Sequence, residues 1–321
     1  MPASPPPASE HLALREAAPG VWAALAAPAG LAASNAGIVD LGGATLVFDT
    51  TFSPASAAEL RAAAEQLTGR PATLVLNSHW HDDHVFGNGV FGPDAAIHAT
   101  AGTLAIMRAT TPGHIAEFKQ HWPRQLAEWS RQAEAAASDA DRREWEDGVR
   151  FARAIIATFP DLQLRLPTHT FSERALLSGT RRTAEFITLG GGHTASDAFL
   201  WLPADRVLFT GDLLVTGNHP DLTAGDPQRW LAILAAFKAL RPSRLVPGHG
   251  ELAAVADIEA LEQYLGYLLQ LADEMNARAE PLPAPAAPAL LPAFAAAWAN
   301  QEAFVRNLEF CRKRSAGSGR Q

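Results

Sequence analysis

The chain has 321 residues, of which 48% are hydrophobic and 19% are charged. This composition is typical of a globular protein with a sizeable core and excludes a disordered chain. The formal net charge is −8, from 26 basic and 34 acidic residues, and gives no sign of binding to a nucleic-acid backbone. The single cysteine, Cys311, excludes an internal disulfide framework.

The sequence also argues against a membrane protein. No uncharged apolar run is long enough to span a bilayer. The start of the chain is rich in proline, alanine and serine and lacks the basic and apolar regions of a signal peptide. We therefore expect a soluble, cytoplasmic protein whose partner is a small-molecule substrate rather than a nucleic acid or a membrane.

The first part of the chain is predicted to combine short strands with one helix. Residues 1–19 are expected to form a flexible lead. Strands are expected over residues 21–26, 31–39, 44–48, 72–76 and 95–99. Ser53 and Pro54 have the chemistry of an N-cap and a first helical position, which predicts a helix as far as about Leu67.

A predicted buried strand leads directly into residues 77–84, with the sequence Asn-Ser-His-Trp-His-Asp-Asp-His. Imidazole nitrogen suits zinc or iron, and a carboxylate adds a hard oxygen and a negative charge. In an extended loop, residues two apart point the same way, so His79 and His81 can bind one ion. Asp83 and His84 come after the turn and can face a second ion. The stretch therefore predicts a metal-binding loop at a strand end.

Residues 101–160 have a different character, because they are rich in alanine, glutamate, glutamine and arginine. They are predicted to form two or three helices, with breaks near residues 111–113 and 138–139. Strands resume afterwards, so this segment is interpreted as an insertion that either covers the site as a lid or forms a homodimer interface. His114 and His121 within it are expected to be ordinary surface or packing histidines.

In the second half of the chain, three single polar residues follow predicted strands in glycine-rich settings. His193 follows three consecutive glycines, Asp212 follows a glycine, and His249 stands in the sequence Pro-Gly-His-Gly. Glycine lets the backbone pass close to a ligand. A residue of this kind taken alone is more often structural than functional. A functional interpretation of these three residues therefore depends on their occurring together with the other candidate ligands.

The remaining chain is predicted to be mainly helical. A helix with one apolar face is expected over residues 227–240. A long helix is expected to reach about Glu280, followed by a Pro/Ala-rich linker over 281–292 and a last helix that ends near Arg314. Residues 256–321 are accordingly assigned to a C-terminal helical extension.

The order of these motifs resembles the metallo-β-lactamase superfamily of metallo-hydrolases. The motifs are His79-x-His81-x-Asp83-His84, His193, Asp212 and His249. The resemblance spans about residues 20–255, with the helical insertion inside it. It implies an α/β fold, a four-layer αββα sandwich in which two mixed sheets lie face to face with helices outside.

The resemblance also implies a dinuclear metal centre. It assigns to the first metal His79, His81 and His193, and to the second metal Asp83, His84 and His249. Asp212 is implied to bridge the two ions. Two Zn²⁺ ions are expected, with iron and manganese as alternatives.

Two divalent ions roughly 3.5–4 Å apart can share a hydroxide and polarise a carbonyl or phosphoryl oxygen. We therefore predict an enzyme, a dinuclear metal-dependent hydrolase that uses a metal-bridging hydroxide on an ester, thioester, lactone or related acyl substrate. Asp83 is expected to transfer a proton as the leaving group departs. His219 is expected to hold the substrate's carbonyl oxygen, with an ordinary turn histidine as the equal alternative. Asp49 and Ser78 are candidates for orienting the histidines.

Other activities of the superfamily agree less well with the sequence. Lactamases usually lack the bridging aspartate, so Asp212 counts against a dedicated antibiotic hydrolase. Lactonases share it but often place a tyrosine nearby, and the tyrosines here, Tyr264 and Tyr267, stand in the predicted C-terminal helix. Glyoxalase-type thioesterases share the ligand set, but no clear basic patch for a peptide-like thiol is present, and an alkylsulfatase would be larger. The main alternative is an iron oxidoreductase with persulfide or dioxygen chemistry, since the same ligands bind iron.

Overall fold

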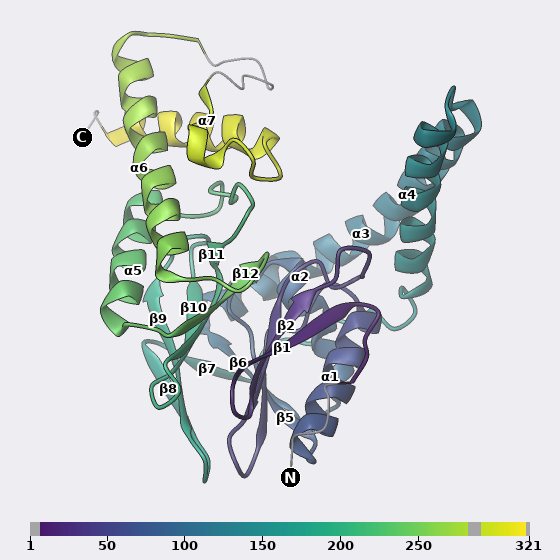
Figure 1. Cartoon of the computed structure of the whole chain (residues 1–321), viewed down its shortest axis with the longest axis vertical. Coiled ribbons are helices and arrows are strands. Elements are labelled where there is room, and N and C mark those ends of the chain that lie inside the picture. Colours follow the sequence, from purple (N-terminus) through teal and green to yellow (C-terminus); the bar gives the residue numbers. More distant parts are fainter. Residues whose placement is uncertain (1–6, 282–289, 319–321) are drawn as a thin grey trace. The chain divides into compact units, whose positions relative to one another are not determined.

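The structure, a computed structural model, describes residues 7–281 and 290–318 (Figure 1). The chain forms two compact units. The first unit consists of Met1–Glu16 and Gly20–Thr170, and the second of Ala17–Pro19 and Phe171–Gln321. Both units combine strands with helices, which agrees with the predicted α/β class. The domain limits predicted from the sequence, 20–255 and 256–321, stay predictions.

The first sheet has seven strands in sequence order. They are β1 (Leu12–Ala18), β2 (Val21–Ala26), β3 (Ala36–Asp40), β4 (Thr45–Phe48), β5 (Ala72–Leu76), β6 (Ala96–Thr100) and β7 (His169–Phe171). Strands β2, β3 and β4 pair antiparallel, whereas β4, β5 and β6 pair parallel. Because β4 and β5 are parallel, their carboxyl ends meet at the same edge, and the residues that follow the two strands come together there.

Strand β1 corrects the prediction of a flexible lead over residues 1–19. Leu12 and Leu14 are buried while the residue between them is half-exposed, so this segment has the two-residue period of a half-buried strand. Two apolar leucines in a short polar segment are a weak signal for a strand. The neighbouring proline-rich start of the chain favoured the prediction of a flexible lead instead. Residues 1–6 of the predicted lead lie outside the described residues.

Helix α1 (Pro54–Thr68) confirms the predicted helix start. The Ser53 hydroxyl accepts a hydrogen bond from the Ser56 backbone N–H, and the two side chains form a capping box. Gly69 ends the helix with φ of 71°, a left-handed conformation that glycine adopts without strain. The buried face of α1 packs on the first sheet through residues such as Leu60.

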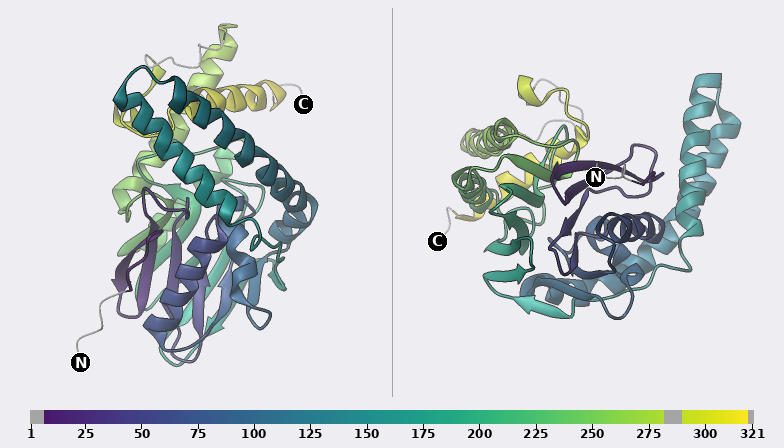
Figure 2. Two further views of the ribbon diagram at one scale, coloured as in Figure 1. Left: turned by 90° about the vertical axis from the view of Figure 1, so that its right-hand side faces the viewer. Right: turned by 60° about the horizontal axis from the view of Figure 1, so that its bottom comes forward.

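The insertion forms a helical hairpin of α3 (Ala101–Ala135) and α4 (Asp139–Ala157), whose two arms run side by side (Figure 2). The break near 138–139 is confirmed, and Ser138 caps α4. The predicted break at 111–113 is wrong, because α3 continues through Pro112. A proline inside a helix costs about 3 kcal/mol, and buried residues on both sides of it, Met107 and Phe118, hold the helix against the first unit's core.

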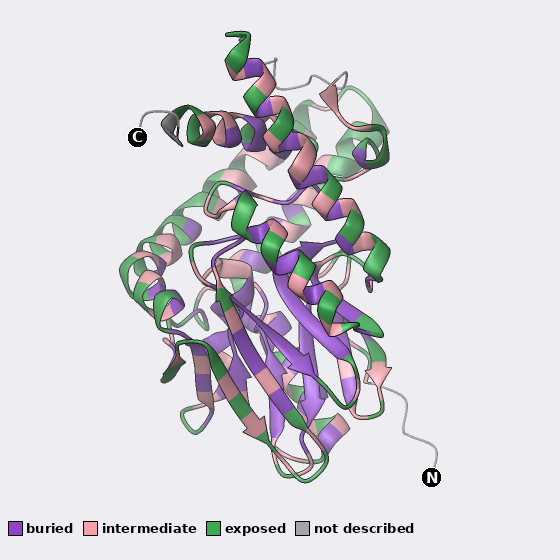
Figure 3. Cartoon of the chain, turned by 90° about the vertical axis from the view of Figure 1, so that its left-hand side faces the viewer, coloured by how far each residue is buried: buried purple, intermediate pink, exposed green. Residues whose placement is uncertain are grey.

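The second sheet has the strand order β12-β11-β10-β9-β8. Its strands are β8 (Arg174–Ser178), β9 (Thr183–Gly190), β10 (Asp197–Leu202), β11 (Val207–Val215) and β12 (Arg244–His249). In this sheet β11 and β12 pair parallel, and the other neighbouring strands pair antiparallel. Helices α5 (Pro227–Leu240) and α6 (Val255–Ala277) pack on it through a cluster that includes Trp230, Phe237 and Tyr264. Strands β10 and β11 are buried along their whole length; Figure 3 shows in purple how buried residues gather on strands of the protein.

The C-terminal part contains η3 (Ala293–Ala295) and α7 (Glu302–Ser318). Helix α7 joins the core of the second unit through Phe304, Leu308 and Cys311, which confirms the predicted last helix. Most of the predicted linker, residues 282–289, lies outside the described residues. Within the described part of the chain, no helix is long and apolar enough to cross a membrane.

Candidate metal centre

The metal-binding loop predicted from the sequence leaves β5 and turns into the short helix α2 (Asp82–Val85), which η1 (Phe86–Phe91) follows. The ring of His79 lies between two other imidazoles, with its centroid 4.6 Å from that of His81 and 4.3 Å from that of His84. His79 and His84 are almost fully buried. The Nε2 atom of His84 lies 3.5 Å from Oδ2 of Asp83. The structure thus brings the four residues of this loop together.

Asp49, which follows β4, binds this loop through hydrogen bonds. Its carboxylate accepts hydrogen bonds from the Ser78 backbone N–H and hydroxyl, both at 2.7 Å, and lies 2.8 Å from His84 Nδ1. Since the Ser78 hydroxyl donates to Asp49, it is left to accept from His79 Nδ1, 2.9 Å away. Nδ1 of His79 and Nδ1 of His84 therefore carry the proton, and the lone pair of each ring lies on Nε2, which points away from Asp49. These contacts agree with the orienting function expected for Asp49 and Ser78.

The electrostatics of Asp49 follow from its position. Burial raises the pKa of this carboxyl, while His84 and the hydrogen bonds from Ser78 act against that rise. Asp49 also has φ of 58°, a left-handed conformation that aspartate tolerates better than most residues. Strained backbone of this kind persists where the surroundings over-determine it, as the hydrogen bonds of Asp49 do here.

The helical insertion contacts the metal-binding loop directly. His114 of α3 lies 3.1 Å from Asp82 through Nδ1 and Oδ1, and its ring lies 5.7 Å from that of Trp80. Trp80 in turn packs edge-on against His81. His114 therefore has a specific partner beside the predicted ligands, unlike the ordinary packing histidine expected. His121 is exposed and packs edge-on against Trp122, its neighbour in the helix.

In the second unit, three strands bring His193, Asp212 and His249 together. Oδ2 of Asp212 lies 3.4 Å from Nε2 of His193 and 3.3 Å from Nε2 of His249. His193 follows β9, while His249 ends β12. Asp212 was expected at the end of its strand, but β11 continues to Val215. The pairing of β11 with β12 shifts register around Gly211, which has φ of 53°, and this irregularity re-aims the following side chain.

Two aspartates hold the turn that carries His193. The carboxylate of Asp197 accepts hydrogen bonds from the backbone N–H groups of Gly192, at 2.7 Å, and Thr194. Burial raises the pKa of Asp197, and His193 and these hydrogen bonds oppose the rise. His193 Nδ1 donates to the backbone oxygen of Asp221 at 3.0 Å. Neither aspartate was identified from the sequence, although Asp197 follows His193 by four residues in a turn that also contains Thr194 and Ser196.

Gly248 belongs to the glycine-rich setting of His249 that the sequence indicates, and the structure shows what this glycine approaches. A Cβ atom there would lie 1.9 Å from Oδ1 of Asp212 and 2.8 Å from the backbone of Gly211. No side chain fits in that space. The glycine before His249 is therefore needed for the close approach of β12 to Asp212.

The nitrogen–oxygen distances within each unit fit metal ligands. Bonds of 2.0–2.2 Å in a tetrahedral site separate neighbouring ligand atoms by about 3.3–3.6 Å. The three nitrogen–oxygen distances, between 3.3 and 3.5 Å, fall in this range. A charge-assisted hydrogen bond would be shorter, about 2.7–2.9 Å. With Nδ1 of three histidines already bound to protein partners, the residues present fit a divalent metal such as zinc.

His219 is buried among aromatic residues of the C-terminal part of the chain, namely Tyr264 of α6 and Trp298 between η3 and α7. Its side chain is 2% exposed, and its ring centroid lies 5.3 Å from that of Tyr264 and 5.6 Å from that of Trp298. Nδ1 lies 3.0 Å from the Tyr264 hydroxyl. Burial lowers the pKa of His219. These neighbours give the ring a packing function rather than open access to a substrate.

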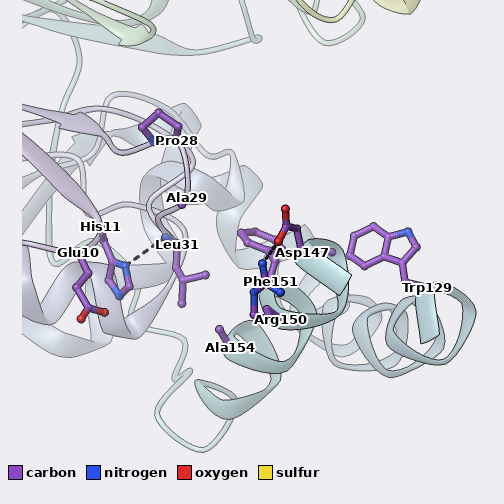
Figure 4. Close-up of a pocket in the computed structure, with 11 residues that line it drawn as sticks. Glu10, His11, Pro28, Ala29, Leu31, Trp129, Asp147, Arg150, Phe151 and Ala154 are labelled. Carbon is purple, nitrogen blue, oxygen red and sulfur yellow. Dashed lines mark hydrogen bonds and ion pairs between the residues drawn. The ribbon is translucent and has the colours of Figure 1, made fainter. Parts of the chain in front are cut away.

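The first unit also contains a cavity of about 640 Å³ beside the helical hairpin (Figure 4). Leu31 lies on one side of it, and Trp129 and Phe151 of the hairpin lie on the other. None of its lining residues is a predicted metal ligand. The candidate metal centre is thus separate from this cavity.

Comparison with known proteins identifies the family. The family model described as "Metallo-beta-lactamase superfamily" matches residues 29–249. The chain is 29% identical over 112 residues to "Metallo-beta-lactamase type 2" of Bacteroides fragilis, which covers 33% of this chain and 45% of that protein. It is 22% identical over 231 residues to "Linear primary-alkylsulfatase" of a Pseudomonas strain, which covers 68% of this chain and 42% of that protein. The matches therefore span less than half the length of these curated relatives.

Solved structures show the same fold. The chain resembles "Metallo-beta-lactamase from Pontibacter korlensis" with a TM-score of 0.58 and 16% identity, over 79% of this chain and 99% of that one. It resembles the metallo-β-lactamase FIM-1 from Pseudomonas aeruginosa with a TM-score of 0.56 and 16% identity, over 81% and 97%. These likenesses confirm the predicted metallo-β-lactamase type of α/β fold. The chain belongs to the metallo-β-lactamase superfamily.

Proposed function

We propose that the chain is a dinuclear metal-dependent hydrolase. The observation that carries the proposal is the convergence of imidazole Nε2 atoms on carboxylate oxygens at metal-ligand spacing within each unit. The proposed ligands of the first ion are His79, His81 and His193, those of the second are Asp83, His84 and His249, and Asp212 bridges them. Membership of the superfamily supports this assembly, because the family match over residues 29–249 includes all seven.

Divalent ions bound by these residues would supply a Lewis acid and lower the pKa of water toward neutrality. We propose two Zn²⁺ ions, and the nitrogen and oxygen ligand set also admits iron or manganese. Asp49 and Ser78 hold His84 and His79 through Nδ1, so Nε2 is the nitrogen with which each of these histidines would bind an ion. The Asp221 carbonyl does the same for His193.

Asp83 is the proposed proton carrier. Its side chain is 23% exposed, whereas that of His84 beside it is fully buried. Oδ2 of Asp83 can therefore exchange a proton with a leaving group as well as bind an ion. His219 is buried, so we do not propose that it contacts the substrate.

The proposed substrate is an ester, thioester, lactone or related acyl compound. Among esters, a sulfate ester is a second candidate, because the match to the linear primary-alkylsulfatase extends over 68% of the chain. The contact of His114 with Asp82 supports the helical hairpin as the element that covers one side of the metal-binding loop.

The test combines elemental analysis of the purified protein with turnover of an ester, a thioester, a lactone, a β-lactam and an alkyl sulfate at fixed zinc. About two zinc ions per chain and turnover of one class would support the proposal, with His81→Ala inactive and His121→Ala, a matched exposed histidine, active. One iron per chain without hydrolysis would favour the iron oxidoreductase instead.

A further inference from the structure

Asn307 of α7 is a fully buried polar residue that binds the loop between β11 and α5. Its Oδ1 accepts a hydrogen bond from the Leu222 backbone N–H at 3.1 Å, and its Nδ2 donates to the Pro220 backbone oxygen at 2.7 Å. Nδ2 also lies 3.4 Å from the hydroxyl of Tyr264, which contacts His219. One side chain of the C-terminal helix thus holds both backbone groups that flank residue 221.

Asp221 is the residue whose carbonyl accepts the Nδ1 hydrogen bond of His193 at 3.0 Å. A proton on Nδ1 leaves the lone pair on Nε2, the atom that lies 3.4 Å from Asp212. Because Asn307 binds the residues on either side of Asp221, it determines where that carbonyl points. A continuous path of hydrogen bonds and backbone therefore leads from α7 to a predicted metal ligand.

Other contacts tie the same loop to the C-terminal segment. The backbone N–H of His219 donates to the backbone oxygen of Ala299 at 3.0 Å. At the far end of the loop, the Arg314 guanidinium binds the carboxylate of Asp226 at 2.9 Å. The first contact and the bonds of Asn307 are buried or part-buried, whereas the Arg314 contact is exposed and is expected to contribute little.

We propose that Asn307 is a positioning residue for the metal centre and that the C-terminal helix is thereby a functional part of it. The inference rests on the proposed metal centre, but it concerns metal affinity rather than turnover. Replacing Asn307 by an apolar residue leaves two buried backbone groups, of Pro220 and Leu222, without their partners. The loop must then shift to satisfy them, and the carbonyl that orients His193 shifts with it.

The test compares Asn307→Leu with Asn276→Leu. Asn276, which is half-buried, is the control, because its two side-chain hydrogen bonds join α6 to Arg312 of α7 instead of binding the loop. The measurements are the dissociation constant for Zn²⁺, by competition with a chromophoric chelator, and the visible spectrum of the Co²⁺-substituted protein. Partners of metal ligands typically contribute 10–100-fold in affinity, so Asn307→Leu is expected to weaken Zn²⁺ binding about tenfold and to change the Co²⁺ spectrum, while Asn276→Leu changes neither.

Unchanged binding in Asn307→Leu, or equal weakening in both variants, would overturn the inference. If Asn307→Leu does not fold, Asn307→Asp takes its place, since it keeps the acceptor for Leu222 and loses the donor to Pro220. Parental Zn²⁺ affinity in that variant would also overturn the inference. A parent protein that binds no metal contradicts the proposed function itself, whereas a metal-binding parent with unaffected Asn307 variants contradicts only the positioning role.

Discussion

The two parts of the candidate metal centre differ in how the chain builds them. In the first unit, the predicted ligands lie within one stretch, residues 79–84, and the side chains of Asp49 and Ser78 orient two of them, His84 and His79. In the second unit, the predicted ligands His193, Asp212 and His249 lie on or directly after three strands, and the backbone carbonyl of Asp221 orients His193. Where the predicted ligands follow one another in a single loop, neighbouring side chains are needed to orient them. A set assembled from separate strands depends on sheet pairing and on glycines that let the strands approach.

The largest effect is expected when Asp212 is replaced, since its Oδ2 is the atom shared by both histidines of the second unit. Asp212→Ala is expected to reduce turnover at least about a thousandfold, because a metal ion supplies several kcal/mol of transition-state stabilisation and each 1.36 kcal/mol is a factor of ten. Kinetics and metal content measure this. Glu259→Ala, which removes an exposed acidic side chain of α6, is the control and should behave as the parent. Substantial activity in Asp212→Ala would contradict the bridging assignment.

Gly248→Ala tests the dependence of the second set on close strand approach. The added Cβ would meet the Asp212 carboxylate and the backbone of Gly211, and overpacking of this kind costs about 1–3 kcal/mol. The expected result is a lower free energy of unfolding in urea and weaker metal binding. Gly266→Ala in α6 is the control, because a Cβ there has no neighbour within 4 Å, and it should stabilise the helix by about 0.5–1 kcal/mol. Equal behaviour of the two variants would refute the steric argument.

Asp49→Asn tests the dependence of the first set on side-chain support. An amide keeps the shape of the carboxylate but not the charge that orients the Nδ1 atom of His84, so Zn²⁺ affinity is expected to fall about 10–100-fold. Chelator competition measures it. Asp40→Asn serves as the control, since Asp40 is also a buried aspartate at the end of a strand but pairs with Arg70. If both substitutions change Zn²⁺ affinity alike, Asp49 has no special relation to the metal-binding loop.

The smallest effect concerns pH. Burial lowers the pKa of His219 in the second unit and, together with His169, that of His98 in the first. The unfolded chain therefore binds a proton at a higher pH than the native protein, and the free energy of unfolding should fall as the pH drops through about 6.5. Urea titrations of metal-free protein at pH 8 and pH 5.5 measure the slope. His219→Phe should flatten it; an unchanged slope would show that the burial of His219 is not linked to stability.

In the interior of α3 and in strand β1, the local sequence was insufficient to predict the secondary structure. Pro112 predicts a break, yet the helix continues because Met107 and Phe118 pack on both sides of it. Leu12 and Leu14 form part of a strand although the neighbouring composition is typical of a flexible lead. In both segments, packing against distant residues contributes more free energy than the local preference.

The sequence by itself determined the α/β class, the helical character of residues 101–160, the cap of α1 and the resemblance of seven residues to those of the metallo-hydrolase superfamily. These depend on residue type and spacing along the chain, which a sequence displays directly. Only the tertiary structure identified the carboxylate of Asp49 as the partner of His84, the carbonyl of Asp221 as the partner of His193, and the space that Gly248 must leave empty. Such contacts join residues far apart in the chain, and strand pairing and close packing decide which of them meet.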